Sequence, residues 1–142
     1  MPEPQDSEAG ASATGGAALT VLAFDFGSRW IGVASGQSIT GQGTRVTTLT
    51  ARRGQADRTQ LQTLIDDYRP DVLVVGLPLN MDGTESAMST RARRFARYLE
   101  KTFDVPTALA DERLTSREGG DHEGAAVLIA QAYLAGATTH SD

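Results

Sequence analysis

Near its start the chain carries an apolar run that ends in an acid, Leu19-Thr20-Val21-Leu22-Ala23-Phe24-Asp25. A short run of this kind indicates a buried strand. Phe26-Gly27-Ser28-Arg29 has the composition of a turn, and Trp30-Ile31-Gly32-Val33-Ala34 then returns as a second strand. We therefore expect a hairpin whose turn directly follows Asp25.

Three more strands and three helices are predicted further along the chain. The strand patterns lie at residues 45–49, 72–75 and 105–110, and the helical patterns lie at residues 61–68, 88–99 and 125–134. The run 72–75 is fully apolar, which is typical of a central strand covered on both faces. The order β-β-β-α-β-α-β-α indicates an α/β domain with its first strand near the centre of the sheet.

The length of 142 residues predicts one domain, and the composition excludes several classes of protein. The chain has no cysteine, which excludes a disulfide framework and a thiolate metal site. No stretch approaches the ~18 apolar residues of a membrane span, and the start lacks the features of a secretory signal, so we expect a cytoplasmic protein. The net charge of −5 argues against nucleic-acid binding through bulk charge alone.

Residues 1–18 and 136–142 lack large apolar side chains, so we expect them to be tails around a domain at residues 19–135.

Two acids, Asp25 and Glu112, stand at the carboxyl ends of predicted strands, where α/β sheets carry their reactive groups. A strand alternates its faces, so only one of Asp111 and Glu112 can point the way that Asp25 points. Asp-His-Glu at residues 121–123 precedes the last helix, where the helix dipole also favours acids. Acids at such places can instead accept hydrogen bonds of a turn, so spacing alone leaves both interpretations open.

The chemistry of these acids favours a hard cation. Carboxylates that converge from separate elements, without cysteine or paired histidines, suit Mg²⁺ or Mn²⁺. Two such ions about 4 Å apart would activate water and stabilise the leaving oxygen of a phosphodiester.

Several arginines, Arg91, Arg93, Arg94 and Arg97, gather on one predicted helix. Like charges at this spacing cost stability unless something negative faces them. A nucleic-acid backbone is one such partner, and acids elsewhere in the fold or solvent are the alternatives.

The loop at residues 76–84 follows the central strand and has the sequence Gly-Leu-Pro-Leu-Asn-Met-Asp-Gly-Thr. Its Asn80 is a candidate for contact with a substrate, whereas the alternative is a rigid loop whose Leu and Met cover the core. Trp30 falls in a strand pattern, and we expect it to lie in the core.

Four segments, at residues 22–34, 74–85, 111–115 and 125–134, together carry a resemblance that covers about residues 19–135. They resemble the YqgF/RuvX family, Holliday-junction-resolvase-like proteins regarded as nucleases that process the 5′ end of pre-16S ribosomal RNA. The Gly-Leu-Pro-Leu-Asn-Met-Asp-Gly-Thr run is the most specific of these motifs.

The resemblance implies an RNase H-like α/β fold, with a mixed five-stranded sheet flanked by helices, and phosphodiester hydrolysis with Mg²⁺ or Mn²⁺. Asp25 matches the family's first-strand acid, and Glu112 matches the acid of its Asp-Glu-Arg motif. The family's third acid precedes the final helix. An ungapped alignment of the final helix places His122 at the position of this third acid, and we assign the role of third acid to its neighbour Asp121.

The leading hypothesis is therefore a metal-dependent endonuclease acting in 5′-end processing of pre-16S rRNA. The expected metal ligands and catalytic residues are Asp25, Glu112 and Asp121, and the expected contacts to precursor rRNA or another structured nucleic acid are Arg91, Arg94, Arg97 and Asn80. Alternatives are a non-catalytic RNA- or protein-binding factor in ribosome assembly or transcription, and a DNA nuclease of the Holliday-junction type. An actin-like ATPase is disfavoured because the chain is too short for the second domain that would close over the nucleotide. We expect a monomer or homodimer with no membrane partner.

Overall fold

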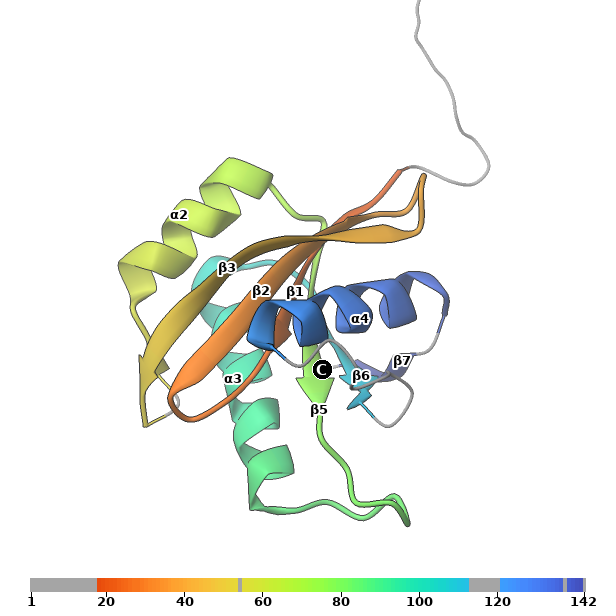
Figure 1. The fold of residues 1–142 in the computed structure, drawn as a ribbon. Coiled ribbons are helices and arrows are strands. Elements are labelled where there is room, and N and C mark those ends of the chain that lie inside the picture. Colours follow the sequence, from red (N-terminus) through yellow and green to blue (C-terminus); the bar gives the residue numbers. More distant parts are fainter. Residues whose placement is uncertain (1–17, 54, 113–120, 137, 142) are drawn as a thin grey trace, which may run out of the picture.

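The chain folds into a mixed sheet with helices on both faces, as this computed structural model shows (Figure 1). The structure describes residues 18–53, 55–112, 121–136 and 138–141. The strands are β1 (Thr20–Asp25), β2 (Trp30–Gln37), β3 (Gln42–Arg52), β4 (Gln55–Ala56), β5 (Val72–Leu77), β6 (Thr107–Asp111) and β7 (Thr138–Ser141). The helices are α2 (Arg58–Tyr68), α3 (Ala87–Phe103) and α4 (His122–Leu134).

Strand β1 lies at the middle of the sheet, whose order in the described residues is β4-β3-β2-β1-β5-β6-β7. It pairs antiparallel with β2, and the register places Asp25 opposite Gly32. The predicted hairpin is therefore confirmed. On its other side β1 pairs parallel with β5, and β5 pairs parallel with β6. The carboxyl ends of these three strands consequently meet at one edge of the sheet.

Two apolar layers hold the helices to the sheet. On one face Leu22 and Phe24 of β1 pack with buried residues of α2 and α3, including Leu61 and Phe95. On the other face alternate residues of β1 and β5 pack against Ile129 and its neighbours in α4. Figure 1 shows α4 crossing one face of the sheet and α3 lying behind it. All six residues of β5 are buried, which confirms the central strand expected from its sequence.

The sheet has more strands than the five we expected. The two-residue β4 pairs with the end of β3, and β7 pairs antiparallel with β6. Residues 138–141, which we expected in a C-terminal tail, thus extend the sheet and satisfy backbone groups that β6 would otherwise leave at an open edge. The expected N-terminal tail lies outside the described residues, apart from Ala18.

Helix boundaries follow local signals that the sequence shows. Ser86 caps α3 in a capping box with Ser89, and serine is among the residues that most often fill this role. Helix α2 ends at Tyr68 with Arg69 as its C-cap, immediately before Pro70, because a residue that precedes proline disfavours the helical conformation. Across the described part of the chain, we find no helix with both the length and the apolar character of a membrane span.

Candidate active site

Asp25 faces α4 at the end of β1. Residues alternate along the strand: Val21 and Ala23 belong to the layer under α4, whereas Leu22 and Phe24 belong to the layer under α2 and α3. Asp25 continues the first series, so its side chain lies on the α4 face of the sheet. Only 16% of that side chain is exposed to solvent.

Glu112 reaches the same face from the end of β6. A methyl group added at Gly76 in β5 would lie 2.7 Å from Oε2 of Glu112 and 2.5 Å from Cδ1 of Ile129 in α4. The Glu112 carboxylate therefore occupies the space above Gly76, which is open because this residue has no side chain. Glu112 is buried, with 7% of its surface exposed.

The two carboxylates consequently flank one strand. β5 separates β1 from β6, and neighbouring strands lie about 4.8 Å apart, so side chains leaning over Gly76 can approach each other. Asp111 continues the opposite series with Leu109, which packs in the layer under α2 and α3. Strand alternation allows only one of Asp111 and Glu112 to share the face of Asp25, and the structure shows that it is Glu112.

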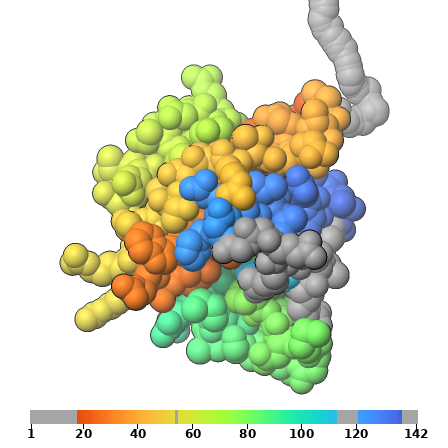
Figure 2. All heavy atoms as spheres, viewed as in Figure 1, coloured from red at the N-terminus to blue at the C-terminus, as the bar shows by residue number. Residues whose placement is uncertain are grey.

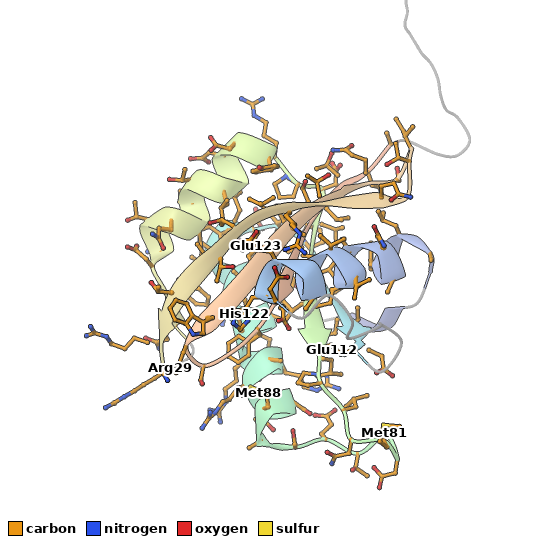
Figure 3. All side chains as sticks on the ribbon, in the orientation of Figure 1. Arg29, Met81, Met88, Glu112, His122 and Glu123 are labelled. Carbon is orange, nitrogen blue, oxygen red and sulfur yellow. The ribbon has the colours of Figure 1, made fainter. Side chains whose placement is uncertain are left out.

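The first turn of α4 sits directly on β2 beside Asp25. A methyl group at Gly32 would overlap the backbone carbonyl of His122 and lie 2.9 Å from the nitrogen of Glu123. Because Gly32 pairs with Asp25, this close approach brings His122 to the site. Nδ1 of His122 lies 3.8 Å from Oδ2 of Asp25. Figure 3 shows His122 and Glu112 at the same edge of the sheet, near the start of α4.

Trp30 lies outside the core, contrary to our expectation. Its surface is 44% exposed, and its ring centroid lies 6.4 Å from that of His122. Trp30 shares a strand face with Gly32, but α4 begins above Gly32, so no helix continues over the tryptophan.

Asp121, which we expected to complete the metal site, has its oxygens engaged elsewhere. As the N-cap of α4 it accepts a hydrogen bond from the backbone N–H of Gly124 at 2.7 Å. Its second oxygen pairs with Nη1 of Arg45 in β3 at 2.5 Å. An N-cap side chain must turn back toward its own helix, and here that orientation also meets Arg45. The structure instead brings His122, the next residue, to Asp25.

Strand β3 fixes the first turn of α4 through two side chains. Arg45 binds Asp121, and the hydroxyl of Thr48 donates a hydrogen bond to Glu123 at 2.9 Å. The helix and the strand touch along the face shown in Figure 2. The position of His122 therefore depends on the contacts that its two sequence neighbours, Asp121 and Glu123, make with β3.

The Arg45–Asp121 pair makes stability depend on pH. Hydrogen bonds from Arg45 and from the Gly124 N–H hold the pKa of Asp121 below its ordinary value. A depressed folded-state pKa contributes stability above the unfolded-state value of about 4, and this contribution is lost as the pH falls through the folded-state value. We expect Asp121→Asn, which keeps the helix cap, to lower the free energy of unfolding at about pH 6 and to approach the wild type at about pH 3.

Urea unfolding at both pH values measures this difference. Arg45→Gln serves as the partner variant, and the double variant should lose little more than either single variant, because both remove one interaction. A difference between wild type and Asp121→Asn that does not change with pH would contradict the assignment.

The arginines of α3 divide into two kinds. Arg93 forms a bidentate pair with Glu85 through Nε and Nη2. Arg91, Arg94 and Arg97 are exposed and form no ion pair with the described part of the chain. An acid of the fold thus neutralises one arginine of the group, and three remain available to an external anion.

Asn80 holds its own loop together. Its side-chain amide donates to the hydroxyl of Thr84 at 2.9 Å, and Asp82 accepts from both the backbone and the hydroxyl of Thr84. Ser89 of α3 donates to the carbonyl of Pro78. These bonds make the loop rigid, as one of our interpretations expected, but Met81 at its tip is 90% exposed and covers no core.

Known proteins resemble this chain in both sequence and fold. The sequence pattern of the RuvX family, described as Holliday junction resolvase, matches residues 19–136. The chain belongs to the RuvX family. A relative in Pseudomonas putida, named "Putative pre-16S rRNA nuclease", is 54% identical over 98 residues, which are 69% of this chain and 70% of the relative. A relative of the same name in Azotobacter vinelandii is 53% identical over 69% of each chain. Another in Pectobacterium carotovorum is 50% identical over 70% of this chain and 71% of the relative.

The fold of this RuvX family member resembles that of RuvC. The structure described as T. thermophilus RuvC in complex with Holliday junction substrate superposes with a TM-score of 0.60 at 11% identity, covering 87% of this chain and 99% of that chain. At this identity the likeness concerns the fold alone. The predicted RNase H-like α/β fold is confirmed.

The donor atoms at the sheet edge suit a divalent cation. Magnesium is commonly held by one or two carboxylates, with water and substrate phosphate as the remaining ligands. Asp25 and Glu112 offer two carboxylates on one face, and the His122 imidazole lies beside the first. Among the described residues, no cluster of three or more His, Asp or Glu side chains is arranged to hold a metal ion by itself.

Proposed function

We propose that this RuvX family member is a metal-dependent endonuclease that acts in the 5′-end processing of pre-16S rRNA in the cytoplasm. The placement of Asp25 and Glu112 on one face of the sheet, with Gly76 between them, is the observation that carries the proposal. The names of its close relatives support the choice of substrate.

Asp25 and Glu112 would hold Mg²⁺ or Mn²⁺ at this edge. When bound, the metal would activate water and stabilise the charge that develops on the phosphodiester. His122 takes the place that we had assigned to Asp121. The imidazole beside Asp25 offers a nitrogen ligand that suits a divalent ion.

Arg91, Arg94 and Arg97 would position the nucleic-acid backbone along α3. The carboxyl end of β5 leads through the 78–85 loop to the start of α3, the helix that carries these arginines. Arginine binds phosphate oxygens through its planar fork, and each contact made increases the dependence of binding on salt. The rigid loop that Asn80 maintains would form a wall beside this path.

A non-catalytic RNA-binding factor is the second candidate. It is favoured by the engagement of Asp121 with Arg45, which leaves two carboxylates on the site face among the described residues. Such a factor would bind precursor RNA without need of metal.

Cleavage assays with the full chain separate these candidates. We expect an RNA with the 5′ leader of 16S rRNA to be cut in the leader when Mg²⁺ or Mn²⁺ is present and to stay intact in EDTA. A four-way DNA junction of equal concentration tests the resolvase alternative. Metal-independent RNA binding without cleavage would contradict the nuclease proposal and favour the binding factor, whereas preferential cutting of the junction would contradict the RNA assignment.

A further inference from the structure

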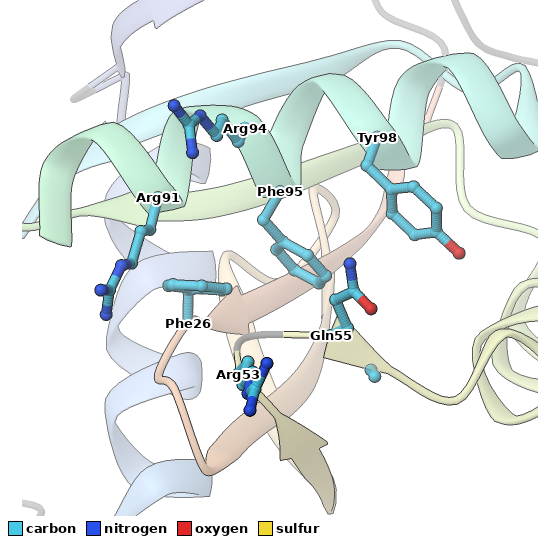
Figure 4. Close-up of a pocket in the computed structure, with 8 residues that line it drawn as sticks. Phe26, Arg53, Gln55, Arg91, Arg94, Phe95 and Tyr98 are labelled. Carbon is cyan, nitrogen blue, oxygen red and sulfur yellow. The ribbon is translucent and has the colours of Figure 1, made fainter.

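A pocket opens on the opposite side of the sheet edge from the carboxylates. Its volume is about 410 Å³, within the ~300–1,000 Å³ range of small-molecule sites. The residues that line it come from the β1–β2 turn, the β3–β4 region and α3, and are Phe26, Arg53, Gln55, Ala56, Arg91, Arg94, Phe95 and Tyr98. Figure 4 shows Arg91, Phe95 and Tyr98 extending from α3 toward the side chains on the other wall.

The positive charge around the pocket favours binding of an anion. Three of the described residues that line it are arginines and none is acidic. Arg53, Arg91 and Arg94 are exposed and make no ion pair with the described residues. Arg53 also adopts a left-handed backbone conformation with φ of 55°, at a hairpin turn where Asn, Asp or Gly is the usual choice. Three like charges around one cavity repel one another, and an anion bound between them would relieve that repulsion.

The aromatic residues of the pocket offer a surface for stacking. Phe26 and Phe95 are buried, with ring centroids 5.2 Å apart, and form its floor. Tyr98 is 39% exposed and lies nearly parallel to Phe95, with a centroid distance of 6.5 Å. A planar base with a phosphate is the ligand that uses both the rings and the guanidinium groups.

The pocket and the carboxylates are joined through consecutive residues. Phe26 follows Asp25 directly, but it packs with the layer under α3, whereas Asp25 faces α4. Their Cα atoms are about 3.8 Å apart, so the carboxylate face and the pocket are one residue apart along the backbone at the end of β1. We infer that the Arg53–Arg91–Arg94–Tyr98 pocket binds an unpaired nucleotide of the substrate strand, next to the bond that is cut. This inference rests on the proposed nuclease function and adds a binding subsite to it.

Binding measurements without metal test the subsite. The probes are a short fluorescent single-stranded RNA and an oligomer of the same backbone without bases, both followed by anisotropy in EDTA with the full chain. Tyr98→Leu should weaken binding of the RNA about tenfold and leave the abasic oligomer unaffected, because it removes the stacking surface alone. Arg53→Gln and Arg94→Gln should weaken both oligomers, and each should lower the slope of log K against log salt by roughly 0.7.

Arg58→Gln is the matched control. Arg58 is exposed on α2 and lies outside the pocket, so the same loss of charge should change neither oligomer's affinity by more than about twofold. The inference is overturned if Tyr98→Leu binds RNA as the wild type does, or if Arg58→Gln weakens binding as much as Arg53→Gln. Displacement of the RNA by micromolar 5′-AMP would also overturn it, because the ligand would then be a free nucleotide.

The outcome is distinguishable from failure of the nuclease proposal. Binding in EDTA requires no cleavage, so a protein that binds through the pocket but never cuts would retain the subsite and lose the proposed activity. A protein that cuts RNA with unchanged binding in the pocket variants would retain the activity and lose the subsite.

Discussion

Replacing Asp25 by Asn should lower the rate of metal-dependent RNA cleavage roughly a thousandfold, equivalent to ~4 kcal/mol of transition-state stabilisation. The substitution keeps the shape of the side chain but removes the negative charge that binds the cation. Since Asp25 ends a central strand beside His122, it cannot be replaced by a neighbouring acid without moving the sheet. Single-turnover cleavage of labelled precursor RNA at saturating Mg²⁺ measures the loss.

Two further variants make this result interpretable. Glu112→Gln should produce a loss of similar size, because the second carboxylate lies on the same face over Gly76. Asp67→Asn makes the same chemical change at an exposed position on α2 and should cleave at the wild-type rate. If Asp25→Asn remained folded and cut RNA as fast as Asp67→Asn, the activity would reside in another site or in a contaminating nuclease.

Replacing Gly32 by Ala should destabilise the protein by about 3 kcal/mol. The added methyl group meets the backbone carbonyl of His122 and the nitrogen of Glu123, and backbone atoms cannot move aside by changing a rotamer. The start of α4 must shift away from β2, which also moves His122 from Asp25. Urea unfolding should show a lower midpoint, and cleavage at low temperature should be slower than in the wild type.

Gly36→Ala is the control for this experiment. Gly36 lies four residues further along β2 on the same face, but a methyl group there meets the side-chain carbons Cγ2 of Val21 at 3.0 Å and Cδ1 of Leu134 at 3.1 Å. Side chains can adjust, so the expected loss is about 1 kcal/mol. Equal losses at the two glycines would show that α4 is not held by backbone contact at Gly32.

The periodic features of this chain, its strand alternation and its helical repeats, could be predicted from the sequence. Strand β1 and the end of β6 each alternate with period two, and this alternation alone predicted that just one of Asp111 and Glu112 shares a face with Asp25. Apolar residues of helix α3 recur every three to four positions, so the helix and its buried stripe were also predicted. These features depend on neighbours within a few residues, which the sequence displays directly.

Tertiary contacts decided which residue at the start of α4 lies beside Asp25. Asp121, His122 and Glu123 are consecutive, and no local pattern tells which of them faces Asp25. The answer depends on the closeness of α4 to Gly32 and on the bonds from Arg45 and Thr48 in β3, more than 70 residues earlier in the chain. The arginine–aromatic pocket is likewise built from segments around residues 26, 53 and 91–98, which only the folded sheet brings together. The sequence by itself therefore determined the α/β class and the order of strands and helices through short-range periodicity, and the family motifs pointed to Asp25 and Glu112. Long-range packing decided that Glu112 rather than Asp111 shares the face of Asp25, and which groups surround the two carboxylates.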